Sequence, residues 1–195
     1  LEEPDDGSVV RRRNLYIRYL PQIPAFTAGD TVLDAIVRDN RDEPHFSSRE
    51  EIEASAKNIL TRLGIYDFDE GCDHLSGGQK KRVALSRTLV DPTEVLILDE
   101  PTNHLDNDMV LWLEEFLNSF RGVLIMVTHD RYFLDKVADK LLVFQGNGKQ
   151  ELYYGNMSSY LLKQKELQQP AEKVKPKTQS KEPAGKKKLS YMEQK

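Results

Sequence analysis

Two short runs of apolar residues constrain the fold of this chain more than any other feature of its sequence. They occupy residues 95–98 and 123–127, and no polar residue interrupts either run. Unbroken hydrophobicity is typical of a strand that is buried on both faces, which occurs in parallel sheets covered by helices. The segment near residues 107–120 predicts a helix, through which a right-handed crossover would join the two strands. We therefore expect an α/β fold with a mostly parallel sheet flanked by helices.

Other segments add strands and helices to this unit. Residues 14–22 predict a short strand that stops at Pro21, and residues 141–144 predict another that returns as a hairpin through residues 151–154. Helices are expected at 31–40, 48–63 and 80–90.

Two of these helices carry further signals. The helix at 48–63 begins with a capping box between Ser48 and Glu51, and it ends at Gly64. In the helix at 80–90 the apolar residues are available to the core. Its basic residues are expected at the surface, namely Lys80, Lys81, Arg82 and Arg87.

Charge is divided unevenly along the chain. Residues 163–195 hold ten Lys against four Glu, a net charge of +6, so residues 1–162 carry −10 within the total of −4. Three prolines stand among Lys, Gln, Ser and Glu in the basic part, and such a composition cannot bury enough apolar surface to fold. We interpret residues 163–188 as a linker, and residues 189–195 as the start of another helix.

Cysteine content and hydropathy exclude several classes of protein. The single Cys72 excludes a disulfide framework within the chain and fits a reducing, cytoplasmic compartment. No apolar run approaches the ~18 residues that span a bilayer, and nothing resembles a signal peptide. Because the chain begins at Leu1 and not at Met, we expect it to be a piece of a longer protein.

Two motifs carry the chemistry. Residues 75–79 read Leu-Ser-Gly-Gly-Gln, a turn that Ser76 caps and that opens onto a helix. Such a turn presents backbone N–H groups and a positive helix end to an anion. The run at 95–98 ends in Asp99 and Glu100, two carboxylates that can hold a metal ion and direct a water. The pair predicts a nucleotide site.

Two more polar residues follow strand ends, namely Gln22 and His129. Singly, each has an ordinary explanation, since an Asp-Glu pair often caps a strand, a lone His is usually structural and a loop Gln is usually solvated. Their convergence favours a site, because ligands of open α/β sheets bind at the carboxyl ends of strands. In triphosphate hydrolysis Asp99 suits the metal, Glu100 suits a base that polarises water, and His129 suits a contact with the γ-phosphate.

These motifs resemble those of an ABC ATPase over roughly residues 10–162. Its signature, Walker B, D-loop, switch-histidine and Q-loop segments correspond to residues 75–79, 95–100, 103–106, 128–130 and 19–22. The stretches 100–106 (Glu-Pro-Thr-Asn-His-Leu-Asp) and 128–134 (Thr-His-Asp-Arg-Tyr-Phe-Leu) further resemble the ABC-F class, and its Uup-type members in particular. ABC-F proteins carry two cassettes and act on ribosomes.

The resemblance implies ATP and Mg²⁺ as cofactors and a role for each matching residue. Gln22 would contact Mg²⁺ or the attacking water, Asp99 would hold the metal, Glu100 would be the general base, and His129 would sense the γ-phosphate. A second cassette, in cis or in trans, would hold the nucleotide whose γ-phosphate binds Ser76, Gly77, Gly78 and Gln79.

The resemblance also implies partners and domains. Asp106 would link the two cassettes, and the ribosome or tRNA would be the target of the parent protein, which has no membrane spans. Residues 1–162 would form a partial cassette, and residues 189–195 would begin a coiled-coil arm. His104 belongs to the D-loop pattern, and we assign it no chemistry.

One family motif does not occur in these 195 residues. No Gly-x-x-x-x-Gly-Lys-[Ser/Thr] is found, because Gly185-Lys-Lys-Lys has neither the leading glycine nor the preceding strand. The aromatic residue that would stack on adenine before this motif is also missing. The β- and γ-phosphates therefore lack their principal holder. We expect the parent protein to be an ATPase and this chain alone to be inactive.

The order of the segments allows two histories. Up to about His129 the chain resembles a first cassette, and from about Leu141 it resembles the exit of a second. An internal deletion that fuses the first cassette to the exit of the second would explain this order. The alternative is a first cassette that runs into the inter-cassette linker.

Three functions remain open at this point. The leading one is a truncated ABC-F cassette whose parent works on the ribosome. The second is the ATPase subunit of a membrane transporter, which the Asn-His-Leu-Asp form at 103–106 disfavours. The third is a non-catalytic remnant that supplies its signature motif in trans.

Overall fold

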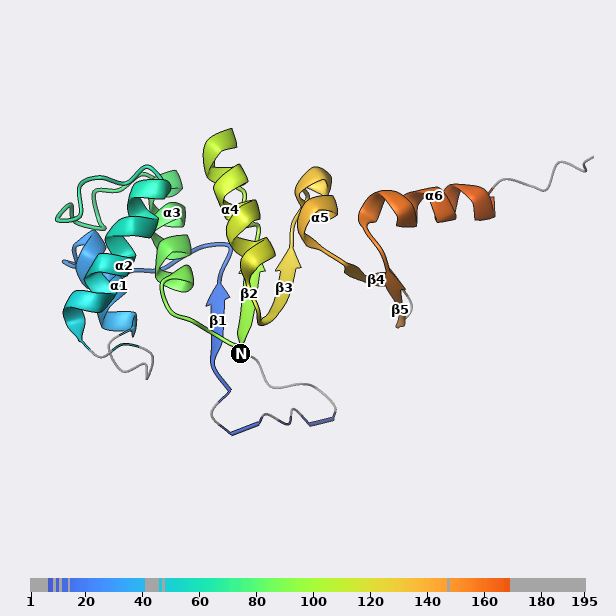
Figure 1. Ribbon diagram of the computed structural model, residues 1–195, viewed down its shortest axis with the longest axis horizontal. Coiled ribbons are helices and arrows are strands. Elements are labelled where there is room, and N and C mark those ends of the chain that lie inside the picture. Colours follow the sequence, from blue (N-terminus) through green and yellow to red (C-terminus); the bar gives the residue numbers. More distant parts are fainter. Residues whose placement is uncertain are drawn as a thin grey trace, which may run out of the picture.

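The computed structural model describes residues 7–8, 10, 12–13, 15–40, 46, 48–146 and 148–168. Residues 169–188 of the predicted linker and the helix predicted at 189–195 lie outside these residues. The elements follow one another along the chain as Figure 1 shows: β1 (Ile17–Leu20), α1 (Val32–Asn40), α2 (Arg49–Arg62), α3 (Gly77–Leu89), β2 (Val95–Asp99), α4 (Asn107–Ser119), β3 (Val123–Val127), α5 (Arg131–Val137), β4 (Lys140–Gly146), β5 (Lys149–Tyr154) and α6 (Met157–Gln168).

Three parallel strands form the central sheet, in the order β1-β2-β3. The register pairs Leu20 of β1 with Leu98 of β2, and Leu98 with Met126 of β3. Helix α4 makes the crossover between β2 and β3, so the βαβ unit predicted from the two apolar runs is confirmed. Parallel pairing also means that all three strands end at the same edge of the sheet.

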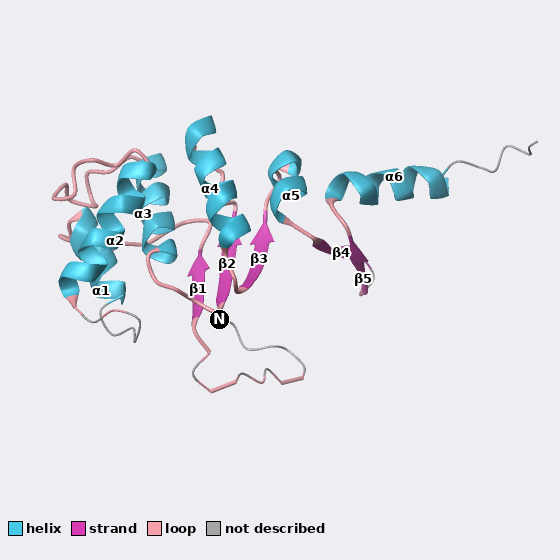
Figure 2. Ribbon diagram, viewed as in Figure 1, coloured by secondary structure: helices cyan, strands magenta, loops and turns pink. Residues whose placement is uncertain are grey.

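One face of this sheet is covered by helices. Leu20, Leu96 and Leu98 project from it and are fully or almost fully buried. They pack against apolar side chains of α3, α4 and α5, among them Leu85, Leu113 and Phe133. Figure 2 shows these helices above the strands. The core that fixes the strands therefore lies on this side.

The opposite face of the sheet corrects a prediction made from the sequence. Residues 123–127 were expected to be buried on both faces, but Val123, Ile125 and Val127 of β3 are 50–61% exposed. Tyr19 of β1 lies on the same face, since it pairs with Ile97 and Ile97 pairs with Ile125. Among the described residues this face has no helical cover. The unbroken apolar run predicts a strand with two apolar faces, but in the structure only one of these faces is packed.

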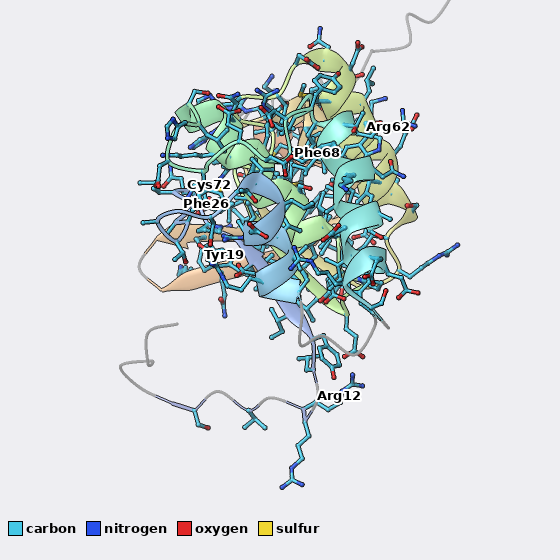
Figure 3. The ribbon with its side chains drawn as sticks, turned by 90° about the vertical axis from the view of Figure 1, so that its left-hand side faces the viewer. Arg12, Tyr19, Phe26, Arg62, Phe68 and Cys72 are labelled. Atoms are coloured by element: carbon cyan, nitrogen blue, oxygen red, sulfur yellow. The ribbon has the colours of Figure 1, made fainter. Side chains whose placement is uncertain are left out.

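Helices α1, α2 and α3 build a second core beside the sheet. Val32, Ile36, Ile52, Ala56 and Leu60 are buried there. Phe26, Phe68 and Cys72 lie at this unit, which faces the viewer in Figure 3.

The ends of α2 follow the sequence signals. Ser48 caps its start by accepting a hydrogen bond from the Glu51 N–H, at 3.3 Å, which is the Ser48 half of the predicted capping box. The chain leaves the helix at Gly64, whose φ of +67° is readily adopted by glycine. The predicted limits of this helix are confirmed to within a residue or two.

The C-terminal part contains a hairpin and two helices. Strands β4 and β5 pair antiparallel, as predicted, and form a separate two-stranded sheet. Helices α5 and α6 were not predicted. Asp130 caps α5 by accepting from the Phe133 N–H, and the Asn156 side chain accepts from the Ser159 N–H at the start of α6. Helix α6 runs to Gln168, beyond residue 162, and the domain limits themselves remain predictions.

No helix among the described residues is both long enough and apolar enough to cross a bilayer.

The covered face of the sheet gives a first prediction. Leu98→Ala leaves a cavity where the side chain is fully buried, so it lowers the free energy of unfolding by about 2–5 kcal/mol. Leu142→Ala is the matched control, because Leu142 is 57% exposed on the hairpin, and its effect stays within about 0.5 kcal/mol. Urea unfolding of both variants measures this difference. Equal losses would show that the core does not lie on the side described here.

Candidate functional site

The edge where the three parallel strands end collects the polar residues predicted from the sequence. Gln22 follows β1, Asp99 ends β2 with Glu100 directly after it, and His129 follows β3 by two residues. Gln22 and His129 are exposed, Asp99 is half-buried and Glu100 is buried. The structure thus brings to one edge residues that are more than 100 positions apart in the chain.

Glu100 is held by three contacts with the end of β3. Its N–H donates to the Val127 carbonyl at 2.8 Å. Its carboxylate Oε2 accepts from the Thr128 hydroxyl at 3.2 Å and from the His129 N–H at 3.4 Å. Thr128 also accepts from the Asp130 N–H at 3.1 Å, so its hydroxyl is fixed on both sides. The Glu100 carboxylate therefore has a defined direction.

The backbone of Glu100 is unusual. Its φ is +49°, in the left-handed region that non-glycine residues rarely occupy, and such conformations persist only where surrounding contacts fix them. The contacts with β3 provide that restraint. His129 lies next to Glu100, with 3.7 Å between His129 Nε2 and Glu100 Oε1, as expected for neighbouring strands.

The Leu-Ser-Gly-Gly-Gln turn forms a complete capping box at the start of α3. Ser76 Oγ accepts from the Gln79 N–H at 3.3 Å, and Gln79 Oε1 accepts from the Ser76 N–H at 2.9 Å. Gly77 is exposed, and a Cβ added there would meet no atom of the described residues within 4 Å. Helix α3 begins at Gly77, three residues earlier than predicted, so the two glycines lie in its first turn.

His104 lies against this turn. A Cβ added to Gly78 would lie 3.3 Å from His104 Cβ, and His104 has a φ of +68°. Sequence reasoning assigned His104 no chemistry, and the structure gives it a packing contact with the second glycine. The turn and the segment after β2 therefore meet within one chain.

A cavity of about 330 Å³ joins these segments. It is lined by Gln22, Ile23, Pro24, Gly77, Lys80, Lys81, Asn103 and His104. Another hollow, of about 520 Å³, lies between α1 and α2, and none of the site residues predicted from the sequence lines it. Size alone would favour that second hollow, but the chemistry of the strand edge favours the first.

Lys81 was expected at the surface, and this expectation is wrong. Its side chain is buried, with 4% of the residue exposed, and Nζ donates to the carbonyls of Pro21, Gln22 and Asp99 at 2.8, 3.2 and 2.8 Å. Helical spacing could have revealed this, because Lys81 shares a face with the buried Ala84 and Leu85. Burial lowers the pKa of Lys81 from its usual value, and the nearby Asp99 and Glu100 oppose that effect.

Asp106 has a local role that the structure shows directly. It caps α4 by accepting a hydrogen bond from the Met109 N–H at 2.9 Å. The side chain is exposed, so the link to a second cassette expected of this residue stays a prediction.

The donor groups at the strand edge fit a Mg²⁺ ion with a phosphate ligand. Mg²⁺ is usually held by one or two carboxylates, with substrate phosphates and waters completing its shell. Asp99, Glu100 and Gln22 offer such oxygens at one edge. No cluster of three or more His, Cys, Asp or Glu side chains that could enclose a metal occurs within the described ranges. The site therefore suits a metal that arrives with its phosphate.

Comparison with known proteins agrees with this geometry. The family model described as ABC transporter matches residues 2–103. An uncharacterized ABC transporter ATP-binding protein of Bacillus subtilis, YfmR, is 32% identical over 213 residues, covering 92% of this chain and 34% of the relative. The energy-dependent translational throttle protein EttA of Haemophilus influenzae is 48% identical over 108 residues, covering 55% of this chain and 19% of the relative. The chain thus spans about a third or less of these relatives.

Solved structures show the same fold. The ATP binding subunit of an ABC transporter aligns with a TM-score of 0.66 at 18% identity, covering 77% of this chain and 62% of that one, a likeness of fold alone. The archaeal ribosome recycling factor aABCE1, solved in complex with the archaeal ribosomal stalk protein aP1, aligns with a TM-score of 0.62 at 27% identity. That alignment covers 83% of this chain and 32% of the matched chain.

The contacts of Glu100 give a second prediction. Thr128→Val removes the hydroxyl that donates to the buried carboxylate, so it lowers the free energy of unfolding by about 1–2 kcal/mol. Thr102→Val is the matched control, because Thr102 is also half-buried beside the end of β2 and its hydroxyl makes no hydrogen bond to the residues that the structure describes. Its effect stays within about 0.5 kcal/mol in the same urea titration. A loss in Thr102→Val as large as that in Thr128→Val would contradict the assignment.

Proposed function

Because this chain belongs to the ABC transporter family, we propose that it is part of an ATP-binding cassette of an ABC-F protein that acts on the ribosome in translation. The convergence of Gln22, Asp99, Glu100 and His129 at one sheet edge carries the proposal. Each of these residues matches a motif of ABC ATPases, and the capping box at Ser76 presents the signature turn. The cytoplasm would be the site of action.

Two comparisons support the narrower assignment to translation. EttA is named as an energy-dependent translational throttle protein, and aABCE1 is named as a ribosome recycling factor. The segment Asn103–His104–Leu105–Asp106 and the Thr128–His129 pair resemble the ABC-F class, with Uup-type members as the proposed branch. The ATPase subunit of a membrane transporter is the alternative, and its solved counterpart shares the fold.

The residues of this chain divide into two groups in the proposed mechanism. In a complete cassette, Asp99 and Gln22 would hold the Mg²⁺ ion that accompanies the nucleotide, and that ion would neutralise charge on the phosphates. There Glu100 would accept a proton from the attacking water, and its contacts with the Thr128 hydroxyl and the His129 N–H orient the carboxylate. His129, exposed beside Glu100, contacts the terminal phosphate.

The second group serves a different nucleotide. The N–H groups at the start of α3 and the Ser76 hydroxyl bind the γ-phosphate of an ATP held by a second cassette, and Asp106 contacts that cassette. Gly77 is open to solvent, so an anion can approach the backbone there. This chain would then provide a signature motif in trans even without turning over ATP itself, the third function considered above.

Ribosome binding provides a third prediction. The tagged chain, mixed with a P-loop-bearing ABC-F cassette and a non-hydrolysable ATP analogue, should pellet with ribosomes through a sucrose cushion and be released by high salt. Recovery with the membrane fraction, together with an integral membrane partner, would instead support the transporter subunit. The tag alone is the control for trapping in the pellet.

ATP turnover provides a fourth prediction. These 195 residues alone should show no Mg²⁺-dependent ATP hydrolysis above the rate of the Glu100→Gln variant. Mixed with a P-loop-bearing ABC-F cassette whose own signature is inactivated, the chain should restore turnover. Steady-state phosphate release measures both.

Two variants separate the two groups of residues in that mixture. Gly77→Ala places a methyl group where the anion would approach, and none of the described residues opposes that methyl group, so it should lower the restored rate about tenfold or more without loss of folding. Glu100→Gln should leave the restored rate largely intact, because it changes the chain's own nucleotide site. The reverse pattern would refute the division.

A further inference from the structure

We propose that Lys81 is a positioning residue that fixes the backbone at the ends of β1 and β2 and joins the signature turn to the residues of the chain's own nucleotide site. The positioning role is argued from three hydrogen bonds of Lys81 and does not depend on the proposed function. The link between two nucleotide sites rests on the function proposed above.

The ammonium group of Lys81 is fully used. A lysine ammonium has three N–H donors, and Nζ has three acceptors here, the carbonyls of Pro21, Gln22 and Asp99. All three are main-chain atoms at the carboxyl ends of two neighbouring strands. Only 4% of Lys81 is exposed.

Two of the three carbonyls that Lys81 binds belong to residues of the predicted site, namely Gln22 and Asp99. Fixing these carbonyls therefore also fixes the backbone that carries the two side chains. The Asp99 carbonyl and the Glu100 N–H form one peptide group, with Lys81 bound to its oxygen and the Val127 carbonyl bound to its nitrogen. Because both sides of this group are held, its plane is fixed. The positive φ of Glu100 follows directly after that plane and sets where the carboxylate points.

Space filling does not account for a lysine at this position. Burying a charge is costly unless it is paired and hydrogen-bonded, and a methionine would fill a similar volume without that cost. The carbonyls and the nearby carboxylates of Asp99 and Glu100 compensate the charge of Lys81. A charged donor with three directed bonds orients the backbone, which an apolar side chain does not do.

Lys81 also connects two parts of the site. It lies four residues after Gly77, one turn along α3, so it moves with the signature turn. A shift of the start of α3 when it engages a phosphate would therefore pull on the carbonyls of Gln22 and Asp99. In the proposed cassette, occupancy of the site in the facing cassette would in this way be sensed by this chain's own metal and water residues.

The first test observes the ammonium group in the unmodified chain. With ¹⁵N-labelled lysine at neutral pH, one lysine ammonium resonance should persist through slow hydrogen exchange, since the group is buried and fully bonded. The resonance should be absent from Lys81→Met and present in Lys80→Met, the matched control on the next residue. Absence of any such resonance in the unmodified chain would overturn the proposal without requiring a variant to fold.

The second test follows the Glu100 amide by hydrogen exchange. Lys81→Met should raise its exchange rate about tenfold relative to the Gly155 amide, which donates to the Asp139 carbonyl far from the site. In Lys81→Arg the Glu100 amide should keep much of its protection, because arginine retains a charged donor. If Lys81 only filled space, Lys81→Met would leave the exchange rate unchanged. Unchanged exchange, or an equal rise at both amides, would refute positioning.

These tests are independent of the proposed function. If the chain neither binds ribosomes nor restores turnover in a partner, the ammonium resonance and the Glu100 amide still decide whether Lys81 holds the strand ends. If the chain does restore turnover, the link predicts that ATP bound by the partner cassette changes the exchange rate of the Glu100 amide in the unmodified chain and in Lys80→Met, but not in Lys81→Met. A Glu100 amide that does not respond to the partner's ATP in the unmodified chain would remove that link and leave the positioning role.

Discussion

The parallel pairing of β1, β2 and β3 is the constraint on which the rest of the structure depends. In an antiparallel sheet the ends of neighbouring strands point in opposite directions, and Gln22 and Glu100 would lie at opposite edges. Here the register joins Leu20 to Leu98 and Leu98 to Met126, so three chain segments end side by side. The buried leucines of the covered face hold this register, because a shift by one residue would move them to the open face.

The sequence predicted the parts of the fold that have a strong periodic or compositional signal. The strands at 95–98 and 123–127, the helix near 107–120 and the hairpin all have such signals, and all are present. Helix α5 has only seven residues, which is too short for a clear helical period. It begins directly after His129, and the residues there were interpreted as part of the site, so the capping role of Asp130 was not predicted. Helix α6 begins after Asn156 with a weakly amphipathic sequence and runs into residues that composition assigned to a linker.

The sequence predicted that the polar residues after the strands lie at one sheet edge, and it did not predict the contacts among them. Pattern and family resemblance predicted Gln22, Asp99, Glu100 and His129 as site residues because each stands at or after a strand end, and the structure places all four at one edge. Neither could identify the Thr128 hydroxyl on Glu100 or the left-handed backbone at Glu100, since both depend on the exact approach of two strands. Lys81 was missed for another reason, namely that charge was taken as evidence of exposure. Its helical position among buried residues was the better guide.

The two halves of the site differ in what builds them. The signature turn has its own capping box between Ser76 and Gln79, a local contact that forms with the start of α3, in addition to the packing of His104 against Gly78. The strand-edge residues need the long-range register of the sheet, whose other face leaves Val123, Ile125 and Val127 without cover among the described residues. The capping box can keep its geometry when the sheet loosens, whereas the orientation of the Glu100 carboxylate depends on the sheet. Lys81 connects the start of α3 to the strand ends, so the helix helps to fix the residues that depend on the sheet.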